Sequence, residues 1–315
     1  MITRRDLLAA AGAALPLAAV AQTPPLPELR IGYQKNGLLY IDKQRGLIEA
    51  RFRAQNVAVR WVEFTFGPPM LEALNVGSIN YGAVGDTPPV FAQAANAKLV
   101  YVAAQEAAGS GSAVLVPPGS PLQRLEDLRG KRVGFARASS AHNLTVAALE
   151  KAGLRWNEIT PVPLPPADAR AAFERGSLDA WTIWDPFFAV AEARPGVRVL
   201  APATAISAQN SFFLAGRDFA QAHPQAVAAV NEELARTARW AGENRPEVAR
   251  LLSEASGIGL DVWERAVARA EFAVGPMNAG VVEEQQRIAD RFHRLGLIPR
   301  PVPVRDIVWQ WRTQS

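Results

Sequence analysis

The first half of the chain alternates short apolar runs with segments of helical periodicity. Apolar or strictly alternating runs predict strands, and apolar residues repeated every three or four positions predict helices. The predicted strands are 29–34, 57–64, 79–85 and 99–105, and the predicted helices between them are 38–52, 68–77 and 88–97. Strands that alternate with helices form parallel sheets covered on both faces, so this half predicts an α/β unit.

A second unit of the same kind follows, and then a helical tail. Its predicted strands are 112–117, 132–137, 159–164, 180–184, 197–201 and 211–216, and its helices are 141–153, 166–176 and 185–193. The tail predicts helices at 225–244, 246–257, 261–270 and 281–296. We therefore expect lobe 1 to comprise 28–111 plus 216–315 and lobe 2 to comprise 112–215. Strands near 112–117 and 211–216 are expected to cross between the lobes as a two-stranded hinge, with a ligand cleft at the strand ends.

The first residues have the pattern of an export signal. Arg4 and Arg5 precede an apolar stretch from 7 to 20, which ends in Ala-Val-Ala at 19–21. This order of charged region, apolar region and A-x-A site predicts a signal peptide, residues 1–21, that is cleaved on export to the periplasm. The apolar stretch is shorter than the roughly 20 residues needed to span a bilayer. The run Thr-Arg-Arg-Asp-Leu-Leu resembles a twin-arginine signal and favours that route over the Sec route.

Composition removes several classes of function. The chain has 315 residues, of which 49% are hydrophobic and 20% charged, as in soluble globular proteins. Its formal charge is only +4 and no dense Lys/Arg run occurs, so we expect no nucleic-acid partner. It contains no cysteine, which excludes disulfides, thiol nucleophiles and thiolate metal sites. The sequence contains no P-loop and no H-E-x-x-H motif, so we expect neither a cofactor nor a metal.

Four junctions between a predicted strand and helix share one design. They are 63–70, 83–90, 135–143 and 182–188, and each places Gly, Pro, Ser, Thr or Asp before the helix. A helix N-terminus carries partial positive charge and unpaired N–H groups, so small residues there let an anion approach. Plain capping also explains a single junction, since Asp86, Asp185 and Ser139 are good N-cap residues. The run from Ser139 to Asn143 is richer in hydrogen-bonding side chains than a cap requires.

A catalytic interpretation of this run is weak. Ser140 and His142 are two residues apart and point in different directions on a helix. No G-x-S-x-G elbow is present. On the strand 180–184, Trp184 is the better cleft candidate, while Trp181 is predicted to lie in the core. Gln34 ends the first strand, where it could either donate to a ligand or face solvent.

The chain resembles the periplasmic aliphatic sulfonate-binding proteins of ABC importers, within the nitrate/sulfonate/taurine-binding group. The resemblance is carried by 29–35, 61–95, 132–153, 166–188 and 198–216, and more loosely by 275–292. Its most specific elements are G-D-x-P-P, S-S-x-H-N and W-x-I-W-D-P in that order. It implies a type II periplasmic-binding fold of two Rossmann-like lobes, an alkanesulfonate ligand, and a separate permease and ATPase as partners. We expect a monomer that is not an enzyme.

The resemblance also implies which residues contact the ligand. They are Gln34, Gly85, Asp86, Thr87, Ser139, Ser140, His142, Asn143, Trp184 and Asp185. We expect the sulfonate at the two helix starts and Trp184 on the organic tail. The two aspartates should cap helices or meet an ammonium group. Family members often carry Gly or Ser where this chain has Ala138 and Ala141, and Tyr40 and Gly67 are expected near the cleft mouth.

Other ligands and one other class remain open. Taurine, nitrate or a thiamine-precursor pyrimidine are alternatives within the binding proteins. An enzyme on the same fold, such as a desulfinase or a pyrimidine synthase, is the alternative outside them. The desulfinase mechanism relies on a Cys nucleophile, which this chain lacks.

Overall fold

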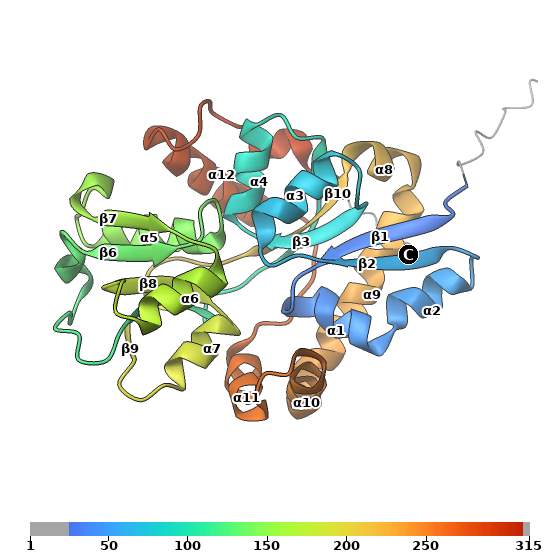
Figure 1. Ribbon diagram of the computed structural model, residues 1–315. Coiled ribbons are helices and arrows are strands. Elements are labelled where there is room, and N and C mark those ends of the chain that lie inside the picture. The colour runs from blue at the N-terminus through green and yellow to red at the C-terminus, as the bar shows by residue number, and fades with distance from the viewer. Residues whose placement is uncertain (1–24, 311–315) are drawn as a thin grey trace, which may run out of the picture.

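The computed structural model describes residues 25–310, so the predicted export signal at 1–21 lies outside the described residues. Two lobes lie side by side, each built on one five-stranded sheet (Figure 1). The α/β architecture predicted from the sequence is confirmed.

Lobe 1 contains the first sheet, in the order β2-β1-β3-β10-β4. Its strands are β1 (Glu28–Tyr33), β2 (Ala58–Glu63), β3 (Tyr81–Gly85), β4 (Leu99–Gln105) and β10 (Ser211–Gly216). Its first helices are α1 (Gly37–Arg45), α2 (Leu47–Arg53), α3 (Gly67–Asn75) and α4 (Thr87–Ala94). The single helix predicted at 38–52 is wrong, because Gly46 has a left-handed φ of 67° that ends α1 and begins α2.

Lobe 2 contains the second sheet, in the order β7-β6-β8-β5-β9. Its strands are β5 (Ser112–Val116), β6 (Arg132–Phe135), β7 (Thr160–Pro163), β8 (Ala180–Trp184) and β9 (Arg198–Pro202). Its helices are α5 (Ser140–Lys151), α6 (Pro166–Glu174) and α7 (Phe187–Glu192). Trp181 is fully buried in this lobe with its ring 5.5 Å from that of Phe173, as predicted.

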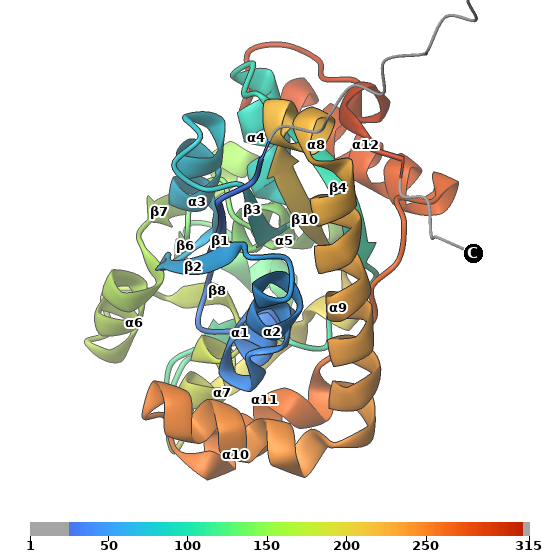
Figure 2. The ribbon, with the colours of Figure 1, turned by 90° about the vertical axis from the view of Figure 1, so that its right-hand side faces the viewer.

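The helical tail returns to lobe 1 and also reaches lobe 2. It comprises α8 (Arg217–Ala222), α9 (Pro224–Glu243), α10 (Arg245–Ser256), α11 (Leu260–Arg269) and α12 (Ala279–Arg294). Helix α9 packs on α1, whereas α11 contacts both α10 and α7 of lobe 2 (Figures 1 and 2). Between residues 25 and 310, no helix combines the length and apolar character needed to cross a bilayer.

The predicted two-stranded hinge needs correction. Strand β10 lies inside the first sheet, antiparallel to β3 and β4, and β5 lies inside the second sheet, antiparallel to β8 and β9. Both sheets are therefore mixed rather than wholly parallel, and residues 211–215 belong to lobe 1. The chain crosses between the lobes at 106–111 and 203–210 instead. These crossing segments contact each other, since Gln209 N–H donates to the carbonyl of Ala107 over 3.0 Å.

Candidate functional site

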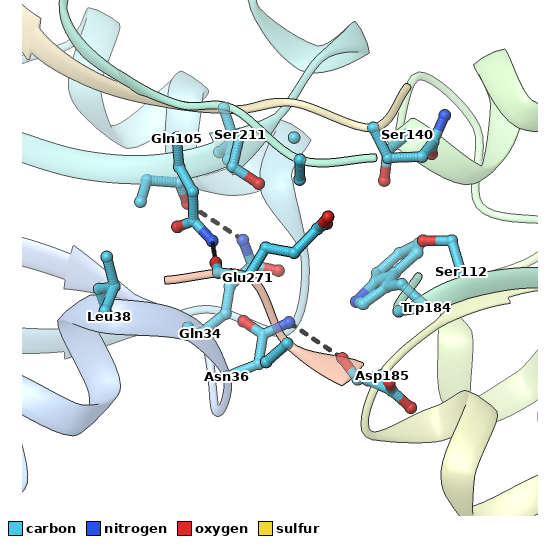
Figure 3. Close-up of a pocket in the computed structure, with 18 of the residues that line it drawn as sticks. Gln34, Asn36, Leu38, Gln105, Ser112, Ser140, Trp184, Asp185, Ser211 and Glu271 are labelled. Carbon is cyan, nitrogen blue, oxygen red and sulfur yellow. Dashed lines mark hydrogen bonds between the residues drawn. The ribbon is translucent and has the colours of Figure 1, made fainter. Parts of the chain in front are cut away.

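A cavity of about 230 Å³ lies between the two lobes, where β1, β3 and β8 end (Figure 3). Six of the predicted ligand contacts line it, and they are Gln34, Gly85, Ser139, Ser140, Trp184 and Asp185. The sequence analysis missed other polar residues of its wall, which are Asn36, Gln105, Ser112, Gln209, Asn210, Ser211, Arg269 and Glu271.

Two helix starts meet at one wall of the cavity. Helix α4 follows Gly85 at the end of β3, and α5 begins at Ser140. The two approach so closely that a Cβ on Gly85 would lie 2.8 Å from the Cβ of Ser140. Glycine is therefore required at position 85. Pro88 and Pro89 in the first turn of α4 carry no N–H, so the first turn of α5, with Thr87 of α4, supplies the backbone donors that can face one small group. This geometry suits an oxyanion.

Hydroxyl groups surround the same space. Ser112, Ser140 and Ser211 line the cavity from β5, α5 and β10 (Figure 3). A serine hydroxyl can donate to an anionic oxygen. Ser139 serves locally instead, because its Oγ donates to the carbonyl of Ala136 over 2.7 Å and makes no capping bond. Side-chain capping, the alternative explanation for this junction, is therefore not observed at Ser139, although Ser139 is the N-cap residue of α5.

Asp86 lies behind this wall in a buried network that joins the lobes. Its carboxylate accepts from Thr87 Oγ1 at 2.7 Å and from Asn143 Nδ2 of lobe 2 at 2.8 Å. Asn143 Oδ1 in turn accepts from Arg291 Nη1 at 2.7 Å. Burial raises the pKa of Asp86 to about 6, against hydrogen bonds that lower it. The side chains of Asp86, Thr87 and Asn143 thus bind one another and lie outside the cavity wall, while their contact with a ligand stays a prediction. Asp86 is also no side-chain cap of α4.

His142 is likewise buried away from the cavity. Its ring stacks on Phe135 of lobe 2 at 4.7 Å and meets Phe292 of lobe 1 edge-on at 5.0 Å. Burial, with the Arg137 charge, lowers the pKa of His142 to about 3, so the ring is neutral. Its Nδ1 accepts the backbone N–H of Ala138 at 3.3 Å, in a turn where Ala138 has a left-handed φ of 58°. The ring therefore lies outside the cavity wall and holds the turn before Ser140, while a ligand contact at His142 stays a prediction.

Asp185 and Arg269 form an ion pair between the lobes at the cavity wall. Arg269 Nε and Nη2 donate to the two Asp185 oxygens at 2.7 and 2.9 Å. Arg269 also pairs with Glu192 at 3.0 Å and lies 3.7 Å over the Phe188 ring. Burial raises the pKa of Asp185, and the Arg269 charge opposes that shift. Asp185 Oδ1 also accepts from the N–H of Ala189 at 3.0 Å, so its carboxylate binds the first turn of α7, although Pro186 rather than Asp185 is the N-cap residue.

The remaining predicted residues divide between wall and core. Gln34 lies in the wall and donates through Nε2 to the carbonyl of Ala83 at 3.2 Å. Trp184 faces it across the cavity and offers an aromatic surface (Figure 3). Gly67 also lines the cavity. Tyr40 does not lie at the cavity mouth as expected, because it is buried in lobe 1 and stacks on Tyr33 at 5.7 Å.

Comparisons with known proteins agree on one group of relatives. The chain matches the family model described as NMT1/THI5 like over residues 39–249. A relative from Escherichia coli (strain K12) is named as an aliphatic sulfonates-binding protein. It is 40% identical over 294 residues, which cover 93% of this chain and 92% of the relative.

Two solved structures are similar over nearly the whole chain. The periplasmic aliphatic sulphonate binding protein SsuA from Escherichia coli has 40% identity and a TM-score of 0.83, covering 91% of this chain and 98% of its own. The alkanesulfonate-binding protein SsuA from Xanthomonas axonopodis pv. citri, bound to MOPS, has 41% identity and a TM-score of 0.85, covering 90% and 98%.

Proposed function

The chain belongs to the aliphatic sulfonate-binding proteins within the NMT1/THI5 like family, and on that premise we propose that it captures an alkanesulfonate in the cavity between its lobes. It is a periplasmic solute-binding protein of an ABC importer rather than an enzyme. The ligand would be delivered by the monomer to a membrane permease and its ATPase.

The meeting of two helix starts at Gly85 and Ser140 carries this proposal. A sulfonate is a permanent anion with three acceptor oxygens. The partial positive charge of the α4 and α5 N-termini favours such a group without a dedicated Lys or Arg. The hydroxyls of Ser112, Ser140 and Ser211 supply further donors around it. The organic part of the ligand would pack on the apolar surface of Leu38 and Trp184.

Calorimetric titration in a sulfonate-free buffer tests the ligand class. The panel comprises ethanesulfonate, propanesulfonate, taurine, sulfate, nitrate and an aminopyrimidine. We expect the organic sulfonates to bind more tightly than sulfate and nitrate, and the pyrimidine not to bind. Binding of the pyrimidine alone would show that the assignment is wrong, and release of sulfite at catalytic rates would show an enzyme.

A matched pair of glycine variants tests the position of the anion. Gly85→Ala would force its methyl group against Ser140 and separate the two helix starts. We expect propanesulfonate affinity to fall at least about tenfold, the loss of one well-placed charged interaction. Gly242→Ala in α9 is the control, because a Cβ there meets nothing within 4 Å. Equal affinities in the two variants would place the anion elsewhere.

We also propose export of the precursor by the twin-arginine route, which rests on Arg4 and Arg5. Replacing both by lysine keeps the charge and removes the pair of arginines. We expect the double variant to stay in the cytoplasm, as followed by cell fractionation. Normal export of the variant would favour the Sec route instead.

A further inference from the structure

Glu271 places an acidic group in the wall of the proposed sulfonate cavity. It follows α11, and Figure 3 shows its side chain reaching into the cavity. Its carboxylate accepts only from neutral donors among residues 25–310, namely the backbone N–H groups of Ala108 at 2.9 Å and Gly109 at 3.3 Å. Both donors lie on the crossing segment 106–111.

The charges of the cavity wall do not balance. Arg269 is the cation among the lining residues, and Asp185 and Glu271 are the carboxylates. Arg269 is already paired with Asp185, and its third nitrogen pairs with Glu192. A half-buried carboxylate without a counter-charge is costly, and a cation brought by a ligand would remove that cost.

A second acceptor without a donor lies on the same side of the cavity. Gln209 is 8% exposed and lines the cavity, and its Oε1 is buried without a hydrogen-bond partner within the described part of the chain. Its side chain packs against Gly109, where a Cβ would lie 2.9 Å from Gln209 Cγ. The Gly109 N–H donates to Glu271, so the Gln209 side chain and the Glu271 carboxylate both lie at Gly109. Buried acceptors of this kind normally have donors.

We propose that Glu271 and Gln209 form a subsite for a protonated amine, so that the preferred ligands are zwitterionic aminosulfonates. This proposal rests on the proposed function, since the sulfonate is held at Gly85 and Ser140. The ammonium group donates N–H bonds to the Glu271 carboxylate and to Gln209 Oε1. The ligand is then bound at both ends, and its net charge of zero matches a cavity that carries both signs.

Two ligands that differ by one amine test the subsite. They are 3-aminopropanesulfonate and propanesulfonate, titrated calorimetrically into the mature protein at pH 7, with MOPS as a bulkier amine. We expect the wild-type protein to prefer 3-aminopropanesulfonate about five- to tenfold, the effect of one charge-assisted contact. In Glu271→Gln that preference should vanish, while propanesulfonate should bind about twofold more tightly because a repelling charge is gone.

Control variants separate the subsite from general effects. Glu264→Gln removes an exposed carboxylate from the same region, on α11, and should leave both affinities unchanged. Glu271→Asp keeps the charge and should retain part of the preference. Thermal unfolding of each variant checks that the fold is intact.

The outcomes distinguish this proposal from the function on which it rests. Equal affinities in the wild-type protein, or a preference for propanesulfonate, would overturn the amine subsite and leave sulfonate binding intact. Failure of both sulfonates to bind would overturn the proposed function itself. An equal loss of preference in Glu264→Gln would show that overall charge, and not Glu271, sets the preference.

Discussion

Two of the contacts between the lobes differ in chemistry. The first, called here the α5 contact, joins Asn143 and His142 of lobe 2 to Asp86 and Phe292 of lobe 1, and it is buried behind the cavity. The second, called here the Arg269 contact, is the ion pair between Arg269 and Asp185. Its side chains are 19% and 15% exposed and line the cavity.

The difference indicates which contact a ligand can influence. The α5 contact is made of aromatic rings, one amide, a carboxylate of raised pKa and Arg291, which also pairs with Glu150 of α5 at 2.9 Å, and the cavity does not reach it. The Arg269 contact depends on charges that face the ligand. We therefore expect the α5 contact to persist through ligand binding and the Arg269 contact to respond to it.

Removing the cation should have the largest effect. Arg269→Met leaves Asp185 and Glu192 without their counter-charge, and breaking a largely buried ion pair costs about 3 kcal/mol or more. Urea unfolding should show this loss, together with weaker propanesulfonate binding. Arg265→Met changes an exposed arginine on the same helix and should cost less than about 0.5 kcal/mol. Similar losses in the two variants would contradict the role given to the Arg269 contact.

Breaking the α5 contact should reduce stability without removing binding. Asn143→Ala deletes the hydrogen bonds to Asp86 and Arg291. Buried Asp86 then keeps only its bond from Thr87 among its side-chain donors, and losing the Asn143 bond costs about 1–3 kcal/mol. We expect unfolding at lower urea concentration but a change of less than about threefold in propanesulfonate affinity. A larger loss of affinity at unchanged stability would place Asn143 in the ligand site after all.

The α5 contact should also depend on pH through Asp86. Its pKa is raised from 3.8 to about 6, so its contribution to stability is fully present below about pH 4 and is lost as the pH rises through 6. In the wild-type protein this titration should lower the free energy of unfolding by up to about 3 kcal/mol between pH 4 and 7. We expect Asp86→Asn to lack this fall.

The contribution of His142 to stability changes with pH in the opposite direction, so the measurement must separate it from that of Asp86. Its pKa is lowered to about 3, so its contribution is lost as the pH falls from about 6.5 towards 3. The test is therefore the difference between the wild-type protein and Asp86→Asn at each pH. A difference that stays constant from pH 4 to 7 would rule out the titration of Asp86 in this range.

The smallest effect is expected at the turn that supports the α5 contact. Ala138 adopts a left-handed conformation, which costs a non-glycine residue about 1 kcal/mol. Ala138→Gly should therefore raise stability by about that amount in a thermal or urea unfolding experiment. Ala147→Gly, inside α5, should lower stability by about 1 kcal/mol. Destabilisation by both variants would mean that the lost methyl group of Ala138 outweighs the strain.

The sequence predicts the fold well because its signals are local. Apolar periodicity and the Pro and Gly residues at element ends identify nearly every strand and helix, and Gly85 and Ser140 are found because a junction between strand and helix is visible in the chain. Which sheet a strand joins depends on its pairing with distant segments, so the local pattern does not predict it. Strand β10 has the same apolar pattern as its neighbours, and only long-range pairing with β3 and β4 places it in lobe 1.

The same dependence on long-range contacts explains why the sequence analysis missed two residues of the site. Arg269 and Glu271 come from the tail, where the amphipathic pattern of α11 predicts a buried face but not that the helix reaches lobe 2. The resemblance places Asn143 and His142 at the ligand, as part of its S-S-x-H-N element. Helical geometry turns them towards lobe 1 instead, where Asp86 and Phe292 meet them.

Hydrogen exchange with and without saturating propanesulfonate tests most directly whether the Arg269 contact responds to the ligand and the α5 contact does not. We expect slower exchange in 184–189 and 267–272, which carry the Arg269 contact, and nearly unchanged exchange in 88–94 and 285–292, which form the lobe 1 side of the α5 contact. Slowed exchange confined to 88–94 and 285–292, or equal slowing in both regions, would contradict the account.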